Sequence, residues 1–540
     1  MYLSILFKVV GGLGIFLFGM GNMSSGMQKI AGKNFKKILS TLTSNRFLGI
    51  AMGVVITAII QSSSVSTVMT IGFVNASLLT LKQGLGVILG ANIGTTITGW
   101  LLALKIGKYG LTIAGFSGLM YVFSKKESTK IKWLTAMGFG FIFLGLEIMS
   151  GGLSPLRNEP SFIKLFHAFS ADSYFGMLKA VLVGAMITAI VQSSSATLGI
   201  TITLALQGLI DFPTAVALVL GENVGTTITA LIASIGSTSN AKRAAIAHTL
   251  INIIGIIWAT SIFNYYITFL DRIVNPSENL AVAIATAHTI FNVTNVIIIT
   301  PFISYLDIFL RKVIKDKEES KTSVTKLNKL MMKLPETVVY QTKAEVNTMA
   351  YNIKRVFNLL SDCTEDMKTI EVNIQEISEV EEKLDLFEKE IYDLNFELMN
   401  RQLAEDMVET TRANLLVCDE YETISDYLGR IGNRFLMFVE NDITIDEDRL
   451  DFIKKLHGDV KELFKEVHSA YNDENKSILS ESLKKHTQIK SLFKTARRYH
   501  FVNTNETLPQ RLNTGYLDII NFYRRISDHL YNIIEYYMKL

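Results

Sequence analysis

The feature that most constrains the fold of this chain is an internal repeat. Residues 53–101 and 184–232 align without gaps at an offset of 131, with 20 identities in 49 positions. GVVITAIIQSSSVST in the first copy matches GAMITAIVQSSSATL in the second, and LGANIGTTIT matches LGENVGTTIT. Chance does not produce such agreement, so we expect two copies of one structural unit.

The charges and glycines divide the chain into an apolar part and a charged part. Through residue 312 there are 21 Lys and Arg, 9 Asp and Glu, and 32 of the 36 glycines, whereas the rest holds 32 basic and 41 acidic residues. A glycine-rich part with few charges is typical of an integral membrane domain. We therefore predict a transmembrane domain over 1–312, a linker over 313–335 and a soluble domain over 336–540.

Nine apolar runs lie in the first part. Seven are expected to cross about 30 Å of hydrocarbon: 3–23, 84–104, 109–124, 133–150, 214–235, 244–265 and 281–306. The other two, 47–79 and 176–209, are each interrupted midway by polar residues. A break in a membrane helix is tolerated only where it is buried in protein or lines an aqueous cavity, so these two runs predict re-entrant helical hairpins.

The number of crossings sets the orientation of the copies. Three predicted spans separate them, so the second copy should be inverted relative to the first, with repeats over about 47–150 and 176–306. Inverted repeats with discontinuous helices are the architecture of secondary transporters. The predicted loops on one side, 24–46, 125–132 and 236–243, hold 11 Lys and Arg. Those on the other side, 105–108, 151–179 and 266–280, hold 6, which places the soluble domain in the cytoplasm.

The polar interruptions of the two hairpins carry the first candidate site. Each offers three hydroxyls, an amide and backbone groups freed from helical hydrogen bonding. The helix that leaves each break directs its N-terminal N–H groups there, which favours an anion, while carbonyl and hydroxyl oxygens suit sodium. Small polar residues also permit close packing of membrane helices, but clusters paired by a repeat favour a binding site. The candidates are Gln61, Ser62, Ser63, Ser64, Gln192, Ser193, Ser194 and Ser195.

A second pair of segments, 90–96 and 221–227, follows the hairpins. Their glycines are expected to let the helices unwind, so that Asn and Thr oxygens face the hairpin tips. The candidates here are Asn92, Thr95, Thr96, Asn223, Thr226 and Thr227.

No Arg or Lys is expected to reach these segments. An anion would need helix N-termini and co-bound cations to balance its charge, which predicts symport with metal cations. Glu222 replaces Ala91 of the first copy, and could either act as a coupling acid for a cation or proton or face a water-filled vestibule. His248 and His288, in AHTLIN and AHTIFN, are interpreted as polar contacts between two similar bracing helices.

The paired QSSS motifs, each followed by G-x-N-x-G-T-T, resemble the type II sodium/phosphate cotransporter family over roughly residues 1–310. The resemblance implies sodium-coupled movement of inorganic phosphate by alternating access, with anion and sodium held by the two QSSS hairpins and the adjacent helices. We do not expect an enzyme, since no nucleophile–base pair or catalytic metal spacing appears. Two alternatives remain: the same fold moving another oxyanion or exporting phosphate, and a membrane phosphate sensor that acts as a signalling scaffold.

The soluble part has the pattern of a helical bundle. Val346, Met349, Ile353, Val356 and Leu360 follow the 3, 4 spacing of a helix seam. The phrases YETISDYLGRIGN and YRRISDHLYNIIE resemble the paired helices of PhoU-type regulatory domains, which implies a divalent metal held by acidic residues four apart.

The residues nominated for that metal are Glu422, Asp426 and Asp528. Arg524 stands where a second acid would precede Asp528, and a solvated helix face is the favoured alternative.

The expected fold is therefore all-α: a polytopic membrane domain with inverted repeats, and a cytoplasmic PhoU-like bundle. The expected partners are inorganic phosphate, co-transported sodium ions and the lipids of the cytoplasmic membrane, with no nucleic acid. A homodimer and a cytoplasmic regulatory protein are further partners compatible with this organisation.

Overall fold

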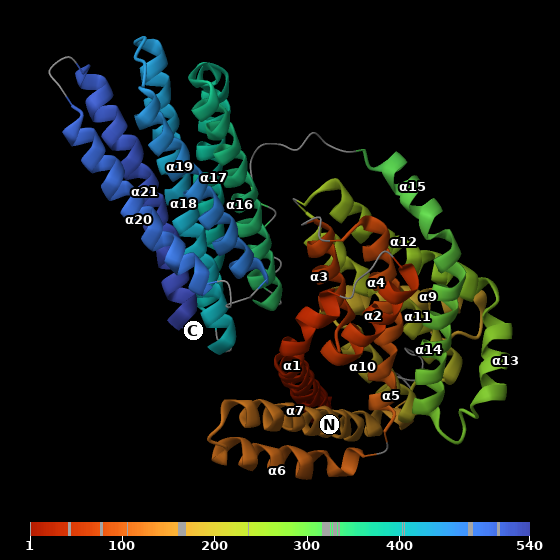
Figure 1. Ribbon diagram of the computed structural model, residues 1–540. Helices are drawn as coiled ribbons and strands as arrows, with labels where there is room; N and C mark the ends of the chain where they lie inside the picture. The colour runs from red at the N-terminus through yellow and green to blue at the C-terminus, as the bar shows by residue number, and fades with distance from the viewer. Residues whose placement is uncertain are drawn as a thin grey trace. The chain divides into compact units, whose positions relative to one another are not determined.

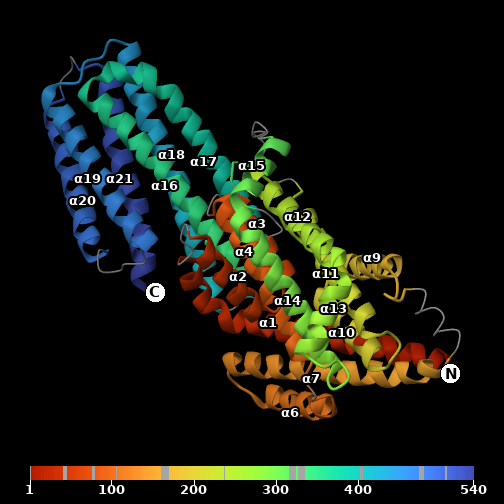
Figure 2. The same ribbon diagram turned by 90° about the vertical axis from the view of Figure 1, so that its right-hand side faces the viewer.

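The computed structural model describes residues 2–40, 45–75, 79–104, 106–159, 169–235, 237–315, 324–325, 327, 332, 335–401, 403, 405–473, 479–504 and 508–539. The regular elements in these ranges are all helices, as Figures 1 and 2 show. Contacts divide the chain into two compact units, Met1–Glu319 and Ser320–Leu540, and each unit is described by itself.

The helices of the first unit follow the apolar runs of the sequence. They are α1 (Tyr2–Ser40), α2 (Arg46–Ile60), α3 (Ser63–Asn75), α4 (Leu81–Gly94), α5 (Thr96–Leu102), α6 (Gly110–Phe123), α7 (Glu127–Leu153), α9 (Tyr174–Val191), α10 (Ser194–Leu206), α11 (Phe212–Ala233), α12 (Ser239–Ser261), α13 (Phe263–Ile273), α14 (Leu280–Ile299) and α15 (Ile303–Val313).

Seven helical segments of the described chain are long and apolar enough to cross a membrane, so this is a multi-pass membrane protein. They are Leu3–Ile30, Leu81–Leu102, Glu127–Arg157, Tyr174–Val191, Phe212–Ala233, Ser239–Ser261 and Leu280–Val313. Large apolar side chains on their surfaces, such as Phe7 and Ile190, are exposed, which suits contact with lipid.

The seven segments differ from the predicted set in two places. The run 109–124 forms α6, which has only 14 residues and spans roughly 21 Å at 1.5 Å per residue. The first arm of the predicted hairpin 176–209, α9, has 18 residues and reaches roughly 27 Å. In addition, α1 continues to Ser40 through most of the predicted loop 24–46. The predicted loop 151–179 includes 160–168, which lie outside the described residues.

The two predicted hairpins are present. The chain leaves α2, turns at Gln61 and continues in α3, and it turns in the same way at Gln192 between α9 and α10. Gly53 of α2 lies against Val87 of α4, and Thr57, one turn later in α2, lies against Gly94, later in α4. The two helices are therefore parallel. Parallel α2 and α4 require that α3 bring the chain back between them. The same relation holds for α9 and α11, where Gly221 and Gly225 face Val181 and Ala185.

Helices α12 and α14 show that the repeats are inverted. His248 and Asn252 of α12 contact Asn92 of the first repeat, and the corresponding residues of α14 contact Asn223 of the second. The two helices run antiparallel, since the Ile251 carbonyl of α12 accepts from Asn295 of α14, whereas Trp258, later in α12, stacks on the ring of Phe291, earlier in α14. Two units with the same internal contacts and antiparallel helices must have opposite orientations.

Helices α1, α6 and α7 form a separate layer beside the two QSSS hairpins (Figure 1), although α6 and most of α7 fall within the predicted first repeat. Small residues allow α1 and α7 to approach closely: a methyl group on Gly19 would lie 2.7 Å from the Gly138 carbonyl oxygen. The layer meets the second repeat through the Phe16 ring, which would lie 2.9 Å from a methyl group on Gly199 of α10.

The second unit is a bundle of long helices. They are α16 (Pro335–Glu365), α17 (Ile370–Met399), α18 (Glu405–Glu440), α19 (Glu447–Asp473), α20 (Leu479–Val502) and α21 (Gln510–Lys539). The predicted seam from Val346 to Leu360 is confirmed, because each of its five residues is no more than 1% exposed. The two PhoU-like phrases lie on α18 and α21. These helices pack antiparallel, since Glu420 contacts His529 whereas Arg434, later in α18, contacts Asp518, earlier in α21.

Candidate functional site

The break between α2 and α3 is held by hydrogen bonds from three helices. Gln61 is left-handed, with φ of 57°, and its N–H donates to the Thr57 carbonyl at 2.7 Å. Its side-chain oxygen accepts from the Thr98 hydroxyl at 3.1 Å, and Ser24 of α1 donates to the Ile60 carbonyl at 2.7 Å. Ser63 Oγ lies 3.4 Å from Thr95 Oγ1. The first break is thus closed by polar contacts, and Gln61 is only 8% exposed.

The break between α9 and α10 has the same backbone conformation as the first break but not the same side-chain contacts. Gln192 has φ of 56°, and its N–H donates to the Thr188 carbonyl at 2.7 Å. A left-handed backbone conformation is uncommon for residues other than glycine. Its occurrence at the same position in both repeats indicates that the surrounding structure imposes it. The Gln192 side chain, however, is exposed, and Thr229, the counterpart of Thr98, is buried without a hydrogen-bond partner. The second break is therefore more open than the first.

The serines after each glutamine cap the returning helices. Ser62 Oγ accepts from the Val65 N–H at 3.3 Å, and Ser193 Oγ accepts from the Ala196 N–H at 3.2 Å. These bonds occupy one of the free N–H groups at each helix start. Ser64 and Ser194, in the first turn of the returning helices, are half-buried, and Ser195 is buried.

The predicted unwinding of 90–96 and 221–227 is wrong. Helix α11 passes through Gly221–Thr227 without a break, and α4 extends to Gly94, with only Thr95 between it and α5. The glycines serve close packing: a methyl group on Gly221 would lie 1.9 Å from the Val181 carbonyl oxygen, and one on Gly90 would lie 2.0 Å from that of Ile50. Thr227 bonds the Val224 carbonyl of its own helix, and Thr96, the first residue of α5, bonds the Ile93 carbonyl near the end of α4.

The asparagines of both motifs are the centres of matching polar clusters. Asn92 Oδ1 lies 3.3 Å from His248 Nε2, and Asn92 Nδ2 donates to Asn252 Oδ1 at 3.4 Å. In the second repeat, Asn223 Oδ1 lies 3.4 Å from His288 Nε2 and accepts from Asn292 Nδ2 at 3.4 Å. The two histidines are therefore interhelical polar contacts, in agreement with the interpretation from sequence.

Glu222 lies beside the second of these clusters. Its side chain is fully buried, and Oε1 lies 3.7 Å from His288 Nε2. The alternative that it faces a water-filled vestibule does not hold in this structure. Thr226, one turn further along α11, donates its hydroxyl to the Glu222 carbonyl at 2.8 Å.

Sequence reasoning missed four residues that position these groups. Ser24 falls in the predicted loop 24–46, because the apolar run of α1 weakens there, and Thr98 lies just beyond the G-x-N-x-G-T-T motif. Asn252 and Asn292 follow the two histidines by four residues in AHTLIN and AHTIFN, so the repeated His-x-x-x-Asn spacing was the available signal. The next residue, Gly99, lies where the repeats meet, since a methyl group there would lie 3.3 Å from Leu198 Cδ2 of α10.

Comparison with known proteins agrees with this architecture. The family model described as Na+/Pi-cotransporter matches residues 15–151 and 164–270, and that of the PhoU domain matches residues 453–537. The protein YqeW of Bacillus subtilis, which is uncharacterized, is 31% identical over 244 residues, covering 45% of this chain and 77% of YqeW. The chain belongs to the Na+/Pi-cotransporter family.

Two further relatives of this Na+/Pi-cotransporter family member carry functional names. The YjbB protein of Salmonella typhimurium, whose name assigns it to inorganic phosphate export, is 26% identical over 51% of this chain and 50% of its own length. The human sodium-dependent phosphate transport protein 2B is 39% identical over 18% of this chain and 15% of its own. No solved structure matches the chain.

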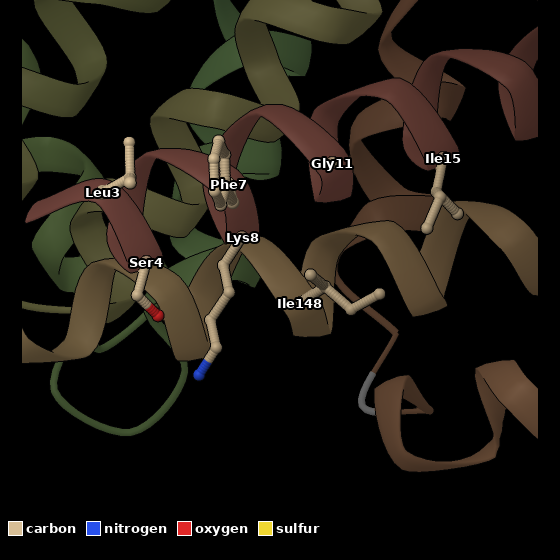
Figure 3. Close-up of a pocket in the computed structure, with 7 residues that line it drawn as sticks. All are labelled: Leu3, Ser4, Phe7, Lys8, Gly11, Ile15 and Ile148. Carbon is tan, nitrogen blue, oxygen red and sulfur yellow. The ribbon is translucent and has the colours of Figure 1, made fainter. Parts of the chain in front are cut away.

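A surface pocket of this cotransporter-family protein lies in the layer of α1, α6 and α7, between α1 and α7 (Figure 3). It is lined by Leu3, Ser4, Phe7, Lys8, Gly11, Ile15 and Ile148, and it contains none of the candidate residues of the repeats. The mostly apolar lining suits contact with lipid chains.

The PhoU-like unit brings together two of the three acids that the sequence nominated. Glu422 and Asp426 of α18 are joined by Asp385 of α17, with one oxygen of each within 4.8 Å of the others. Asp528 is not in this group, because it is paired with Arg524 at 2.6 Å and Lys490 at 3.5 Å. The i, i+4 rule finds acids on one helix face, but it cannot find the acid that a neighbouring helix contributes.

Burial and mutual repulsion of the acids in this cluster should make the stability of the PhoU-like unit pH-dependent. Burial, and then the charges of Asp426 and Glu388, raise the pKa of Glu422 to about 7. An acid with a raised pKa in the folded state loses stability as pH rises from its unfolded value near 4.5 to about 7. We expect Glu422→Gln to raise the melting temperature of the full-length protein by a few degrees at pH 8 and to have no such effect near pH 4.5. Equal gains at both pH values would contradict this cause.

Proposed function

We propose that the protein is a secondary transporter that couples the movement of inorganic phosphate to sodium by alternating access. The observation that carries the proposal is the pair of left-handed QSSS breaks in inverted repeats, at Gln61 and Gln192. The names of relatives such as the human transport protein support phosphate and sodium as the transported species.

The charge environment of the breaks supports coupled transport. Among the described residues, neither the hydrogen bonds nor the ion pairs of the QSSS and G-x-N-x-G-T-T segments involve Lys or Arg. A phosphate anion near these segments would therefore rely on helix N-termini and accompanying cations for charge balance. Sodium is the cation that the relatives name.

The asymmetry of the two breaks supports alternating access. Gln61 is buried and bonded to Thr98, whereas Gln192 is exposed and its counterpart Thr229 is unpartnered. Two equivalent half-sites in unequal states are what a transporter needs if it opens one side at a time. Movement through the cycle would exchange the two states.

The PhoU-like unit is proposed to be a cytoplasmic regulator of transport. The excess of Lys and Arg in the loops on one side of the membrane supports this orientation. Its three-acid group, Asp385, Glu422 and Asp426, is proposed as a divalent-metal site. We also propose that the protein forms a homodimer and that the PhoU-like unit binds a cytoplasmic regulatory partner.

The direct test is uptake of radiolabelled phosphate by proteoliposomes that contain the purified full-length chain. We expect uptake with an inward sodium gradient and only background with a potassium or choline gradient. Wild-type protein that binds phosphate without flux would contradict transport and favour a sensor. The similarity to YjbB makes phosphate export a second candidate, and efflux from preloaded vesicles in the absence of any sodium gradient would support it. Competition by sulfate or arsenate tests the choice of anion.

The serines of the two breaks should affect this flux. We expect Ser63→Ala and Ser194→Ala each to lower sodium-driven phosphate uptake by roughly tenfold at subsaturating phosphate, since a hydrogen bond to a charged ligand contributes about 1.5–3 kcal/mol. Ser261→Ala is the matched control, because Ser261 lies on the exposed face of α12 and bonds only the Ile257 carbonyl. Wild-type uptake in both break variants would remove the hairpins from the site.

A further inference from the structure

The second repeat contains a buried carboxylate without a hydrogen-bond partner. Glu222 on α11 is 0% exposed, and neither Oε1 nor Oε2 has a hydrogen-bond partner among the described residues. His288 Nε2 is 3.7 Å from Oε1, which is longer than a hydrogen bond. An ionised carboxylate in apolar surroundings is strongly unfavourable unless a positive charge compensates it.

His288 is poorly arranged to supply that charge. Its Nε2 faces Asn223 Oδ1 at 3.4 Å, whereas its Nδ1 is buried without a partner. An imidazolium ion carries a proton on each nitrogen and needs two acceptors, but a neutral ring protonated on Nε2 needs only one. The surroundings of His288 therefore fit the neutral form, so whenever Glu222 is ionised its charge must be balanced by something else.

A second unpartnered oxygen lies on the same stretch of α14. Asn292 is four residues after His288, and it donates from Nδ2 to Asn223 Oδ1 and to the His288 carbonyl. Its own Oδ1 is buried and has no hydrogen-bond partner in the described chain. This cluster thus has three buried oxygens without a donor, two from Glu222 and one from Asn292.

The first repeat provides an internal comparison. It has the same frame, in which His248 and Asn252 contact Asn92, but Ala91 stands in the position of Glu222. There the amide of Asn252 is turned so that its Oδ1 accepts from Asn92, and this oxygen is not left free. Of the two His–Asn clusters in the described chain, only the one in the second repeat has unpartnered side-chain oxygens, and it is the one with the carboxylate.

We propose that Glu222 and Asn292 Oδ1 hold one sodium ion in the second repeat, beside the Asn223 cluster and without a counterpart in the first. Hard cations prefer oxygen ligands, and a carboxylate with an amide oxygen provides both negative charge and a neutral ligand. The site deepens the proposed function, on which it rests, by assigning a coupling ion to a specific half of the repeat. It also gives the two half-sites different roles despite their similar sequences.

The test measures sodium binding to the purified full-length protein without phosphate and without flux. The melting temperature is followed as sodium chloride replaces choline chloride at constant ionic strength. We expect a saturable increase for the wild type, and at least a roughly tenfold higher half-saturating sodium concentration for Glu222→Gln. Glu147→Gln, which alters an exposed acid on α7, is the control and should keep the wild-type midpoint. Equal midpoints for wild type and Glu222→Gln would overturn the site, as would a wild type that does not respond to sodium.

Two further arms keep the outcome unambiguous. If Glu222→Gln does not fold, Glu222→Asp retains the charge but withdraws the carboxylate by one methylene, and an unchanged sodium midpoint in that variant would overturn the site. Phosphate uptake is measured separately on the wild type. Absent sodium-driven uptake would refute the proposed function and leave the binding result to decide the site, whereas normal uptake with an unaltered Glu222→Gln midpoint would refute the site alone.

Discussion

Gly221→Ala is expected to destabilise the transmembrane unit severely. The new methyl group would lie 1.9 Å from the Val181 carbonyl oxygen and 2.9 Å from the Ala185 N. These neighbours are backbone atoms that cannot move away by changing rotamer, so α9 and α11 would have to separate. Overpacking of this kind costs about 3 kcal/mol, which corresponds to a loss of roughly 6–12 °C in melting temperature. Thermal unfolding of the detergent-purified protein measures this loss.

Gly151→Ala is the matched control for this prediction. Gly151 also lies in a membrane helix, α7, but a methyl group there would meet nothing within 4 Å. Alanine is a better helix former than glycine, so this variant should be at least as stable as the wild type. If the two variants unfold at the same temperature, close contact between α9 and α11 is not what the motif glycines provide.

These glycines also show where sequence reasoning reached its limit. Glycine can allow a helix to unwind or allow two helices to approach closely, and the letters G-x-N-x-G do not distinguish these uses. The sequence predicted the hairpins correctly because a polar break within an apolar run has few solutions in a membrane. It predicted unwinding at Gly90 and Gly221 wrongly, because the deciding atoms are the carbonyls of Ile50 and Val181 on neighbouring helices.

The repeat predicted two similar half-sites, but the structure makes them unequal. Both QSSS motifs are identical, and Thr98 and Thr229 are identical counterparts, yet only Thr98 bonds the glutamine of its repeat. One difference is Ser24 of α1, which bonds the carbonyl just before Gln61 and lies outside the repeated sequence. Elements outside a repeat can therefore break its symmetry, and an alignment of the two copies cannot reveal this.

Asn223→Leu is expected to have the largest effect on transport. Asn223 Oδ1 is the shared acceptor of His288 Nε2 and Asn292 Nδ2, and its own amide donates to the Val219 carbonyl at 2.9 Å. Leucine has a similar size but removes this acceptor, so His288 Nε2 loses its hydrogen-bond partner and Asn292 Nδ2 keeps only the His288 carbonyl, at about 1–3 kcal/mol for each lost bond. We expect the cost of the lost hydrogen bonds, about 3 kcal/mol in total, to add to the free-energy barrier of the transport cycle. The initial rate of sodium-driven phosphate uptake would then fall by roughly 100-fold.

Two comparisons separate the loss of this acceptor from a general loss of folding. Asn264→Leu changes an exposed residue of α13 whose side chain has no hydrogen bond in the described structure, and it should transport at the wild-type rate. Asn223→Asp keeps an acceptor oxygen for His288 and Asn292, so it should recover part of the activity lost in Asn223→Leu. Equal amounts of monodisperse protein are compared in proteoliposomes. If Asn223→Leu is as active as Asn264→Leu, the His–Asn clusters brace the repeats without taking part in transport, and the functional site must be sought at the QSSS breaks alone.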